Sequence, residues 1–178
     1  MKTKKRVLIA SDHAGIELKA EIISALPDWN WQDLGPMNGD RVDYPDFAQK
    51  LAQKVAQDHS LQGILICGSG IGMSIAANKI PGIRAAVVEN TVAARLAREH
   101  NNANVLCLGS RFIAPAYGSE IARAWLEARF SQDQRHKNRI AKISALETLN
   151  CPKPPSENKE ENRRDEHRLS KRFKNPRP

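Results

Sequence analysis

A cysteine followed by three closely spaced glycines marks the part of this sequence with the clearest capacity for chemistry. Cys67 opens the run CGSGIG, which lies between an apolar stretch and a stretch with helical periodicity. Glycines at alternate positions permit a tight turn whose backbone N–H groups can approach an anion. The same environment favours a thiolate, so Cys67 is either a reactive thiol or a buried core cysteine. The spacing differs from the dinucleotide fingerprint and no P-loop lysine follows, which argues against NAD and ATP.

Several histidines lie where helices are predicted to begin or end. Asp12 and His13 follow the first apolar segment. Asp12 is a good helix N-cap, but capping does not explain His13. His100 ends a predicted helix, where it either complements the helix dipole or acts as a general acid or base. We interpret the other three histidines as solvent-exposed: His59, His136 and His167.

Three arginines could bind a phosphate group. Arg135 and Arg139 are four residues apart and share one face of the last predicted helix. Their guanidinium groups could bind a phosphate dianion, or they could form an ordinary solvated basic face. Arg111 follows the last predicted strand and would add a third cation. Together with the glycine loop, these arginines favour a phosphorylated small molecule over a polymer.

Apolar segments rich in valine and isoleucine alternate with amphipathic stretches along the chain. The predicted strands span 6–11, 31–35, 63–68, 83–89 and 104–110, and the predicted helices span 15–26, 46–59, 72–79, 91–101, 115–130 and 134–149. This alternation is typical of a doubly wound three-layer α/β sandwich, Rossmann-like or flavodoxin-like, with a five-stranded parallel sheet. Ligands bind beyond the carboxyl ends of such strands. We therefore expect an anion site, a thiol and a histidine at that edge.

The net charge divides the chain in two. The 178 residues hold 28 Lys and Arg against 20 Asp and Glu, a net charge of +8. Residues 1–149 contribute 19 and 15, and residues 150–178 contribute 9 and 5, so each part carries +4. The second part has five prolines and almost no apolar residues, which predicts a basic, disordered tail. Such a tail is either a solvated appendage or a weak contact for RNA or an acidic partner. The basic charge therefore does not favour nucleic acid as a partner of the predicted domain, residues 1–149.

Several classes of protein are excluded by composition. No apolar run approaches the roughly 18 residues that span a bilayer, so a membrane protein is not expected. The basic start is followed by too short an apolar run for a signal peptide. The three cysteines are an odd number without metal-ligand spacing, which favours a reducing, cytoplasmic setting.

The motifs taken together resemble ribose-5-phosphate isomerase type B, in a family that also includes galactose-6-phosphate isomerase subunits. The resemblance runs collinearly from about residue 6 to residue 149 through SDHAG, DYPDFA, GILICGSGIGMSIAANKIPGIRAA, EHNNANVLCLGSR and RHKNRI. It implies interconversion of D-ribose 5-phosphate and D-ribulose 5-phosphate through an enediolate, without a metal or organic cofactor. Isomerisation of a six-carbon phosphate, allose 6-phosphate or galactose 6-phosphate, stays open as an alternative.

The resemblance also implies roles for individual residues. Cys67 would move a proton between C2 and C1 of the sugar. His100 would protonate the ring oxygen with the help of Asp12, and Asn101 would bind a sugar hydroxyl. The developing oxyanion would be held by the amides of Gly68, Ser69, Gly70, Ile71 and Gly72. The phosphate and the pocket wall would be contacted by His13, Tyr44, Arg111, Arg135 and Arg139. Relatives of this kind form homodimers or homotetramers with shared sites, so we expect some of these residues to act across an interface.

Overall fold

The computed structural model describes residues 5–149. The strands are β1 (Arg6–Ser11), β2 (Asn30–Asp33), β3 (Gln62–Cys67), β4 (Ala85–Val87) and β5 (Val105–Gly109). The helices are α1 (Ile16–Ala25), α2 (Tyr44–Gln57), α3 (Ile71–Ala77), α4 (Thr91–Asn101), α5 (Pro115–Glu127) and α6 (Gln134–Leu149), and a short 3₁₀ helix η1 (His13–Gly15) precedes α1. Of the described residues, 5–145 form one unit, and the following description concerns that unit. The expected disordered tail and its possible RNA contact lie outside the described residues.

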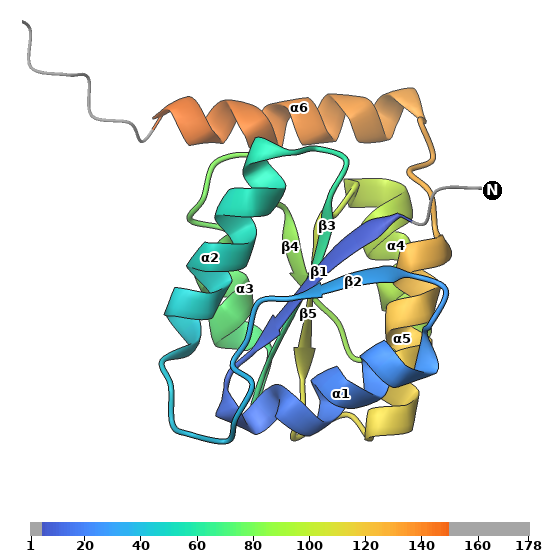
Figure 1. Cartoon of the computed structure of the whole chain (residues 1–178). Helices are drawn as coiled ribbons and strands as arrows, with labels where there is room; N and C mark the ends of the chain where they lie inside the picture. Colours follow the sequence, from blue (N-terminus) through green and yellow to red (C-terminus); the bar gives the residue numbers. More distant parts are fainter. Residues whose placement is uncertain (1–4, 150–178) are drawn as a thin grey trace, which may run out of the picture. The chain divides into compact units, whose positions relative to one another are not determined.

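All five strands are parallel and lie in the order β2-β1-β3-β5-β4 (Figure 1). The central strand β3 is paired with β1 on one side and with β5 on the other, with Cys67 opposite Gly109. The carboxyl ends of β1, β3 and β5 therefore share one edge of the sheet. The predicted parallel α/β sandwich is confirmed.

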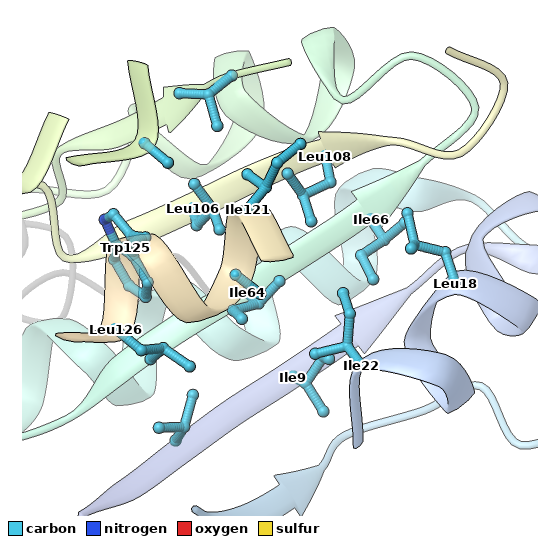
Figure 2. Packing of buried hydrophobic residues seen from close by; sticks show 14 of the residues in the cluster. Ile9, Leu18, Ile22, Ile64, Ile66, Leu106, Leu108, Ile121, Trp125 and Leu126 are labelled. Carbon is cyan, nitrogen blue, oxygen red and sulfur yellow. The ribbon is translucent and has the colours of Figure 1, made fainter. Parts of the chain in front are cut away.

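Alternate residues of each strand face opposite layers of helices, as a sheet buried on both faces requires. Val7 and Ile9 of β1 pack with α1, α4 and α5, together with Trp125 (Figure 2). Leu8 and Ala10 of the same strand pack with α2 and α3 on the other face. The helices that cover the two faces lie on opposite sides of the sheet in Figure 1.

Two elements differ from the prediction in ways that affect the site. Helix α2 begins at Tyr44, two residues before the predicted start, with Pro45 in its first turn. Proline is tolerated there because the first helical N–H groups have no intrahelical acceptor. Strand β4 has only three residues, and at its start the side chains of Asn104 and Asn78 accept the backbone N–H groups of Arg84 and Ala85.

None of the helices between residues 5 and 149 is both long enough and apolar enough to cross a membrane.

Candidate active site

The loops that follow β3 and β5 are bonded to each other at the carboxyl edge of the sheet. The N–H groups of Ser110 and Arg111 donate to the carbonyls of Cys67 and Gly68 at 2.9 and 3.0 Å. Asp12 and His13 follow β1 at the same edge, and the Asp12 N–H donates to the carbonyl of Ile66 at 2.9 Å. The thiol, the glycine loop and Arg111 are therefore neighbours.

The Cys67 thiol is held by the glycine loop that follows it. The Gly70 N–H donates to Cys67 Sγ at 3.1 Å, and Cys67 is only 4% exposed. A backbone N–H directed at sulfur stabilises negative charge on it. Cys107 on β5 differs, because complete burial, aided by nearby Cys67, raises the pKa of its thiol well above the ordinary value. Cys107 is therefore a core cysteine, and Cys151 lies outside the described residues.

Gly70 is the residue on which this loop geometry depends. Its φ is +74°, in the left-handed region. A Cβ at this position would lie 2.9 Å from the Leu108 carbonyl carbon and 2.9 Å from Val87 Cγ2. Only glycine fits both the conformation and the space.

We expect Gly70→Ala to lower kcat by about 100-fold, because the displaced loop moves the N–H away from Sγ. Gly82→Ala is the matched control, since Gly82 has a φ of +82° and a Cβ there meets nothing within 4 Å. Both variants should lose about 1–2 kcal/mol of unfolding free energy from the left-handed conformation, and Gly70→Ala should lose more because its Cβ also meets the Leu108 backbone. Denaturant titration and steady-state kinetics separate the two effects. Similar kcat losses in both variants would contradict the role of loop geometry.

Side chains from other elements cover the glycine loop. A Cβ at Gly72 would lie 2.6 Å from Tyr44 Cζ, so the Tyr44 ring occupies the space beside this glycine. A Cβ at Gly68 would lie 3.0 Å from Arg111 Cζ, so the guanidinium lies over the start of the loop. The Ser69 hydroxyl accepts the Ile71 N–H at 3.3 Å. The loop is thus bordered by an aromatic ring and a cation.

Asp12 acts as the predicted cap. Its Oδ1 accepts the N–H groups of Ala14 and Gly15 at 2.9 and 3.2 Å, and the carboxylate is buried. His13 is exposed, and its Nδ1 accepts the Val42 N–H at 3.5 Å. The β2–α2 segment that carries Val42 and Tyr44 therefore lies beside His13.

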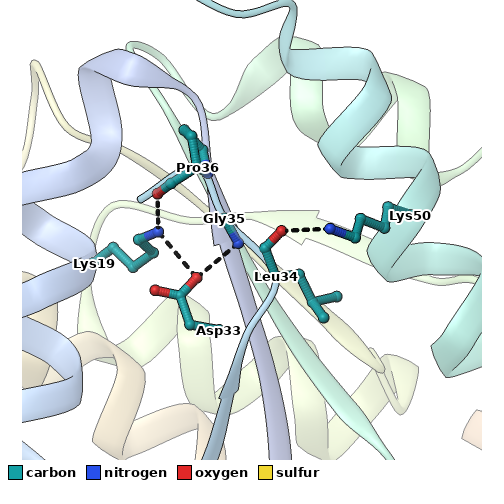
Figure 3. Close-up of polar contacts among 6 residues, drawn as sticks. All are labelled: Lys19, Asp33, Leu34, Gly35, Pro36 and Lys50. Atoms are coloured by element: carbon teal, nitrogen blue, oxygen red, sulfur yellow. Dashed lines mark hydrogen bonds and ion pairs between the residues drawn. The ribbon is translucent and has the colours of Figure 1, made fainter. Parts of the chain in front are cut away.

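A buried lysine holds the start of that segment (Figure 3). Lys19 of α1 is 3% exposed, and its Nζ donates to Asp33 Oδ1 at 3.0 Å and to the Pro36 carbonyl at 2.6 Å. The same Asp33 oxygen accepts the Gly35 N–H at 2.8 Å, and the Gly35 carbonyl accepts the Ser11 N–H at 3.0 Å. This network connects the segment to the residue that precedes Asp12.

We expect Lys19→Met to lower the free energy of unfolding by about 3 kcal/mol, because the Asp33 carboxylate loses its buried partner. Lys50→Met is the matched control: Lys50 Nζ donates to the Leu34 carbonyl of the same segment at 2.8 Å, but Lys50 is exposed. Its loss should cost less than about 1 kcal/mol. Equal shifts of the two denaturation midpoints would contradict the anchoring role of Lys19.

The remaining predicted site residues lie at the opposite edge of the sheet. Helix α4 runs from the carboxyl end of β4 back to the amino end of β5, so His100 and Asn101 lie near Asn104. A strand rises about 3.3 Å per residue, so the five-residue β5 alone separates this edge from Cys67 by about 13 Å. His13 shares the edge of Cys67 as expected, but His100 of the same chain does not.

Two arginines that sequence reasoning did not select hold the end of α4. Arg84 donates through Nε to the carbonyls of Asn101 and Asn102, both at 3.1 Å. Arg98 donates through Nη1 to Asn102 Oδ1 at 2.7 Å and to the Ala103 carbonyl at 3.0 Å. Burial, followed by the charge of Arg84, lowers the pKa of Arg98. The backbone that carries His100 and Asn101 is thereby fixed.

The interpretation of His136 as a solvent-exposed residue is wrong. His136 is 3% exposed, and its ring centroid lies 4.3 Å from that of His100. Arg135 and Arg139, on either side of it in α6, are exposed, and Arg135 pairs with Asp133 at 3.4 Å. His59 is exposed as predicted, and His167 lies outside the described residues. The edge of the sheet at the amino ends of the strands, the amino edge, thus holds His100, Asn101, His136, Arg135 and Arg139.

No group of three or more His, Cys, Asp or Glu side chains within residues 5–149 is placed to hold a metal ion.

Known proteins are similar to this chain in both sequence and fold. A sequence profile of the ribose/galactose isomerase family matches residues 7–143. Ribose-5-phosphate isomerase B of Escherichia coli K12 is 41% identical over 145 residues, covering 80% of the chain and 97% of that relative. Type B ribose 5-phosphate isomerase of Trypanosoma brucei superposes with a TM-score of 0.78 at 43% identity, covering 81% of this chain and 99% of that one. Ribose-5-phosphate isomerase B of Mycoplasma genitalium, whose crystal structure contains bound ribulose-5-phosphate, has a TM-score of 0.77 at 46% identity, with coverages of 80% and 96%. The chain therefore belongs to the ribose/galactose isomerase family, and it is an isomerase.

Proposed function

We propose that the protein interconverts D-ribose 5-phosphate and D-ribulose 5-phosphate, with Cys67 as the base. The observation that carries the proposal is the Gly70 N–H donated to Cys67 Sγ at the carboxyl edge of the sheet. This N–H can donate to a thiolate at Sγ, and the amides at the start of α3 have no preceding helical turn to bond. The activity is assigned to residues 1–149, and no role in it is given to the tail, residues 150–178.

The reaction requires one carbon-bound proton to move between adjacent carbons. In the open-chain aldose, the Cys67 thiolate takes the C2 proton and the electrons pass to the C1 oxygen, which gives an enediolate. Amides of the loop from Gly68 to Gly72, apart from the Gly70 N–H that donates to Cys67 Sγ, stabilise that oxyanion, which is a large contribution in such reactions. The hydroxyl proton passes from O2 to O1, and the thiol then returns its proton to C1 as the electrons on O2 form the carbonyl, which gives the ketose.

The substrate must also be opened from its furanose form and held by its phosphate. We assign ring opening to His100 with Asp12, contact with a sugar hydroxyl to Asn101, and contacts with the phosphate to His13, Arg111, Arg135 and Arg139. Tyr44 lines the pocket. Because Cys67 and His100 of one chain lie at opposite edges, one chain does not complete this set.

We propose that a second copy of the chain completes each site. The edge strand β4 and the neighbouring helices α3 and α4 expose a group of apolar side chains: Ile71, Ile75, Val87, Val92 and Leu96. Several large apolar side chains exposed on adjoining elements favour association. A two-fold dimer would bring the amino edge of each copy to the carboxyl edge of the other and form two equivalent sites.

Substrate length is the sharpest test of the proposed substrate. With the phosphate bound at a fixed distance from Cys67, a six-carbon sugar places C1 and C2 one carbon too far from the phosphate. We expect kcat/KM for ribose 5-phosphate to exceed that for allose 6-phosphate and galactose 6-phosphate by about 10-fold or more. A preference for either six-carbon sugar would replace the pentose assignment with the hexose one.

A further inference from the structure

Arginines hold the backbone that follows His100, and a different residue lies against its ring. The side chain is half-buried and lies in the last turn of α4. Its imidazole ring lies against the ring of His136, with centroids 4.3 Å apart and ring planes at 34°. A general acid must point at its target within a narrow range of distance and angle, so this contact restricts the orientations that His100 can adopt.

The ring of His136 is itself fixed by Ser131, which is in turn hydrogen-bonded to α4. Ser131 Oγ lies 2.7 Å from His136 Nδ1, which makes a hydrogen bond. The Ser131 N–H donates to the Glu99 carbonyl at 3.0 Å, in the helical turn that carries His100. These contacts link Glu99 to Ser131, Ser131 to His136, and His136 to His100, which is the residue after Glu99. A ring that is buried and held at two points can position its neighbour.

The charges around His136 favour its neutral form. Burial lowers the pKa of His136 first, followed by the charges of His100, Arg135 and Arg139, with Asp133 acting in the opposite direction. Two adjacent imidazolium ions repel each other, whereas a neutral aromatic face attracts a cation. A neutral His136 therefore places no like charge beside the ring of His100.

We propose that His136 is a positioning residue that holds the ring of His100 in the orientation needed to protonate the ring oxygen of the cyclic substrate. The inference rests on the ring-opening role proposed for His100. It concerns a step that only cyclic sugars require, and this makes it separable from binding and from the proton transfer at Cys67.

The test compares ribose 5-phosphate with 4-deoxy-D-ribose 5-phosphate, which lacks the hydroxyl that closes the furanose ring. We expect His136→Ala to lower kcat on ribose 5-phosphate by about 10-fold and to change kcat on the deoxy sugar less than about twofold. His136→Phe keeps a flat ring in the same place and should recover most of the loss. His59→Ala, at an exposed histidine, is the control and should leave both rates unchanged.

Three results would overturn the inference: full activity of His136→Ala on ribose 5-phosphate, equal losses on the two sugars, or equal losses in folded His136→Phe and His136→Ala. His100→Asn, measured in parallel, distinguishes a failure of the positioning role of His136 from a failure of the ring-opening role proposed for His100. If His100→Asn shows the difference between the sugars and His136→Ala does not, only the positioning role is wrong. If His100→Asn itself shows no difference, the ring-opening role of His100 is wrong.

Discussion

Replacing Cys67 by alanine is expected to lower kcat for ribose 5-phosphate on the order of 10³-fold, within the range that a positioned acid or base contributes. The fold should be unaffected, because the side chain is small and lies where β3 ends. Cys67→Ser should be almost as impaired, since a hydroxyl at this position can accept the Gly70 N–H but does not ionise near neutral pH. The measurement is steady-state turnover, accompanied by a denaturation curve for each variant.

The matched control for this prediction is Cys107→Ala. Cys107 lies on the neighbouring strand, is completely buried and keeps its proton, because burial raises the pKa of its thiol. Its replacement should cost about 1 kcal/mol of stability and leave kcat nearly unchanged. A Cys67→Ser variant with near-normal turnover would show that another group is the base.

Mixing two inactive variants is expected to restore activity. In the proposed dimer each site takes Cys67 from one subunit and His100 from the other. A hybrid of Cys67→Ala and His100→Asn subunits then has one site with both native residues and one site with both substitutions. An equal mixture after subunit exchange contains about one half hybrids and should show about one quarter of the native activity on ribose 5-phosphate.

The control mixture combines two variants whose substitutions lie at the same edge of the sheet, Cys67→Ala and Gly70→Ala. No hybrid of these subunits contains an intact site, so the mixture should stay inactive. Subunit exchange is verified independently with a charge tag on one variant and ion-exchange separation of the hybrids. Verified hybrids of the first pair that stay inactive would show that Cys67 and His100 are not combined across subunits.

The elements of this fold could be predicted because their signals are local. A strand such as β3, with an unbroken apolar sequence, has no face suited to solvent, and the glycines after it permit only a turn. The order of the strands could not be predicted, because it depends on pairing between distant segments. Arg111 lies beside Gly68 only because β5 is inserted between β3 and β4.

The same distinction explains the outcome for the candidate site. Asp12 was recognisable as a cap because capping depends on the next three residues. His136 was not recognisable as buried, because α6 is polar on most sides and a contact with the end of α4 determines which residue faces inward. The split between the two edges was equally hidden, since a motif such as EHNNAN does not show at which edge its helix ends.

The glycine loop separates the chemistry of the site from the shape of its pocket. The contact to the thiol is made by the backbone of Gly70, whereas the volume around the loop is filled by Tyr44 and Arg111 from other elements. A substitution at Tyr44 would therefore change the space beside the loop while the backbone contact between Gly70 and the thiol is preserved. A lineage with this fold could thus vary the wall of the pocket at Tyr44 while the loop stays the same. The loop itself would be closed to such change, because a larger residue at Gly72 requires a smaller one at Tyr44 at the same time.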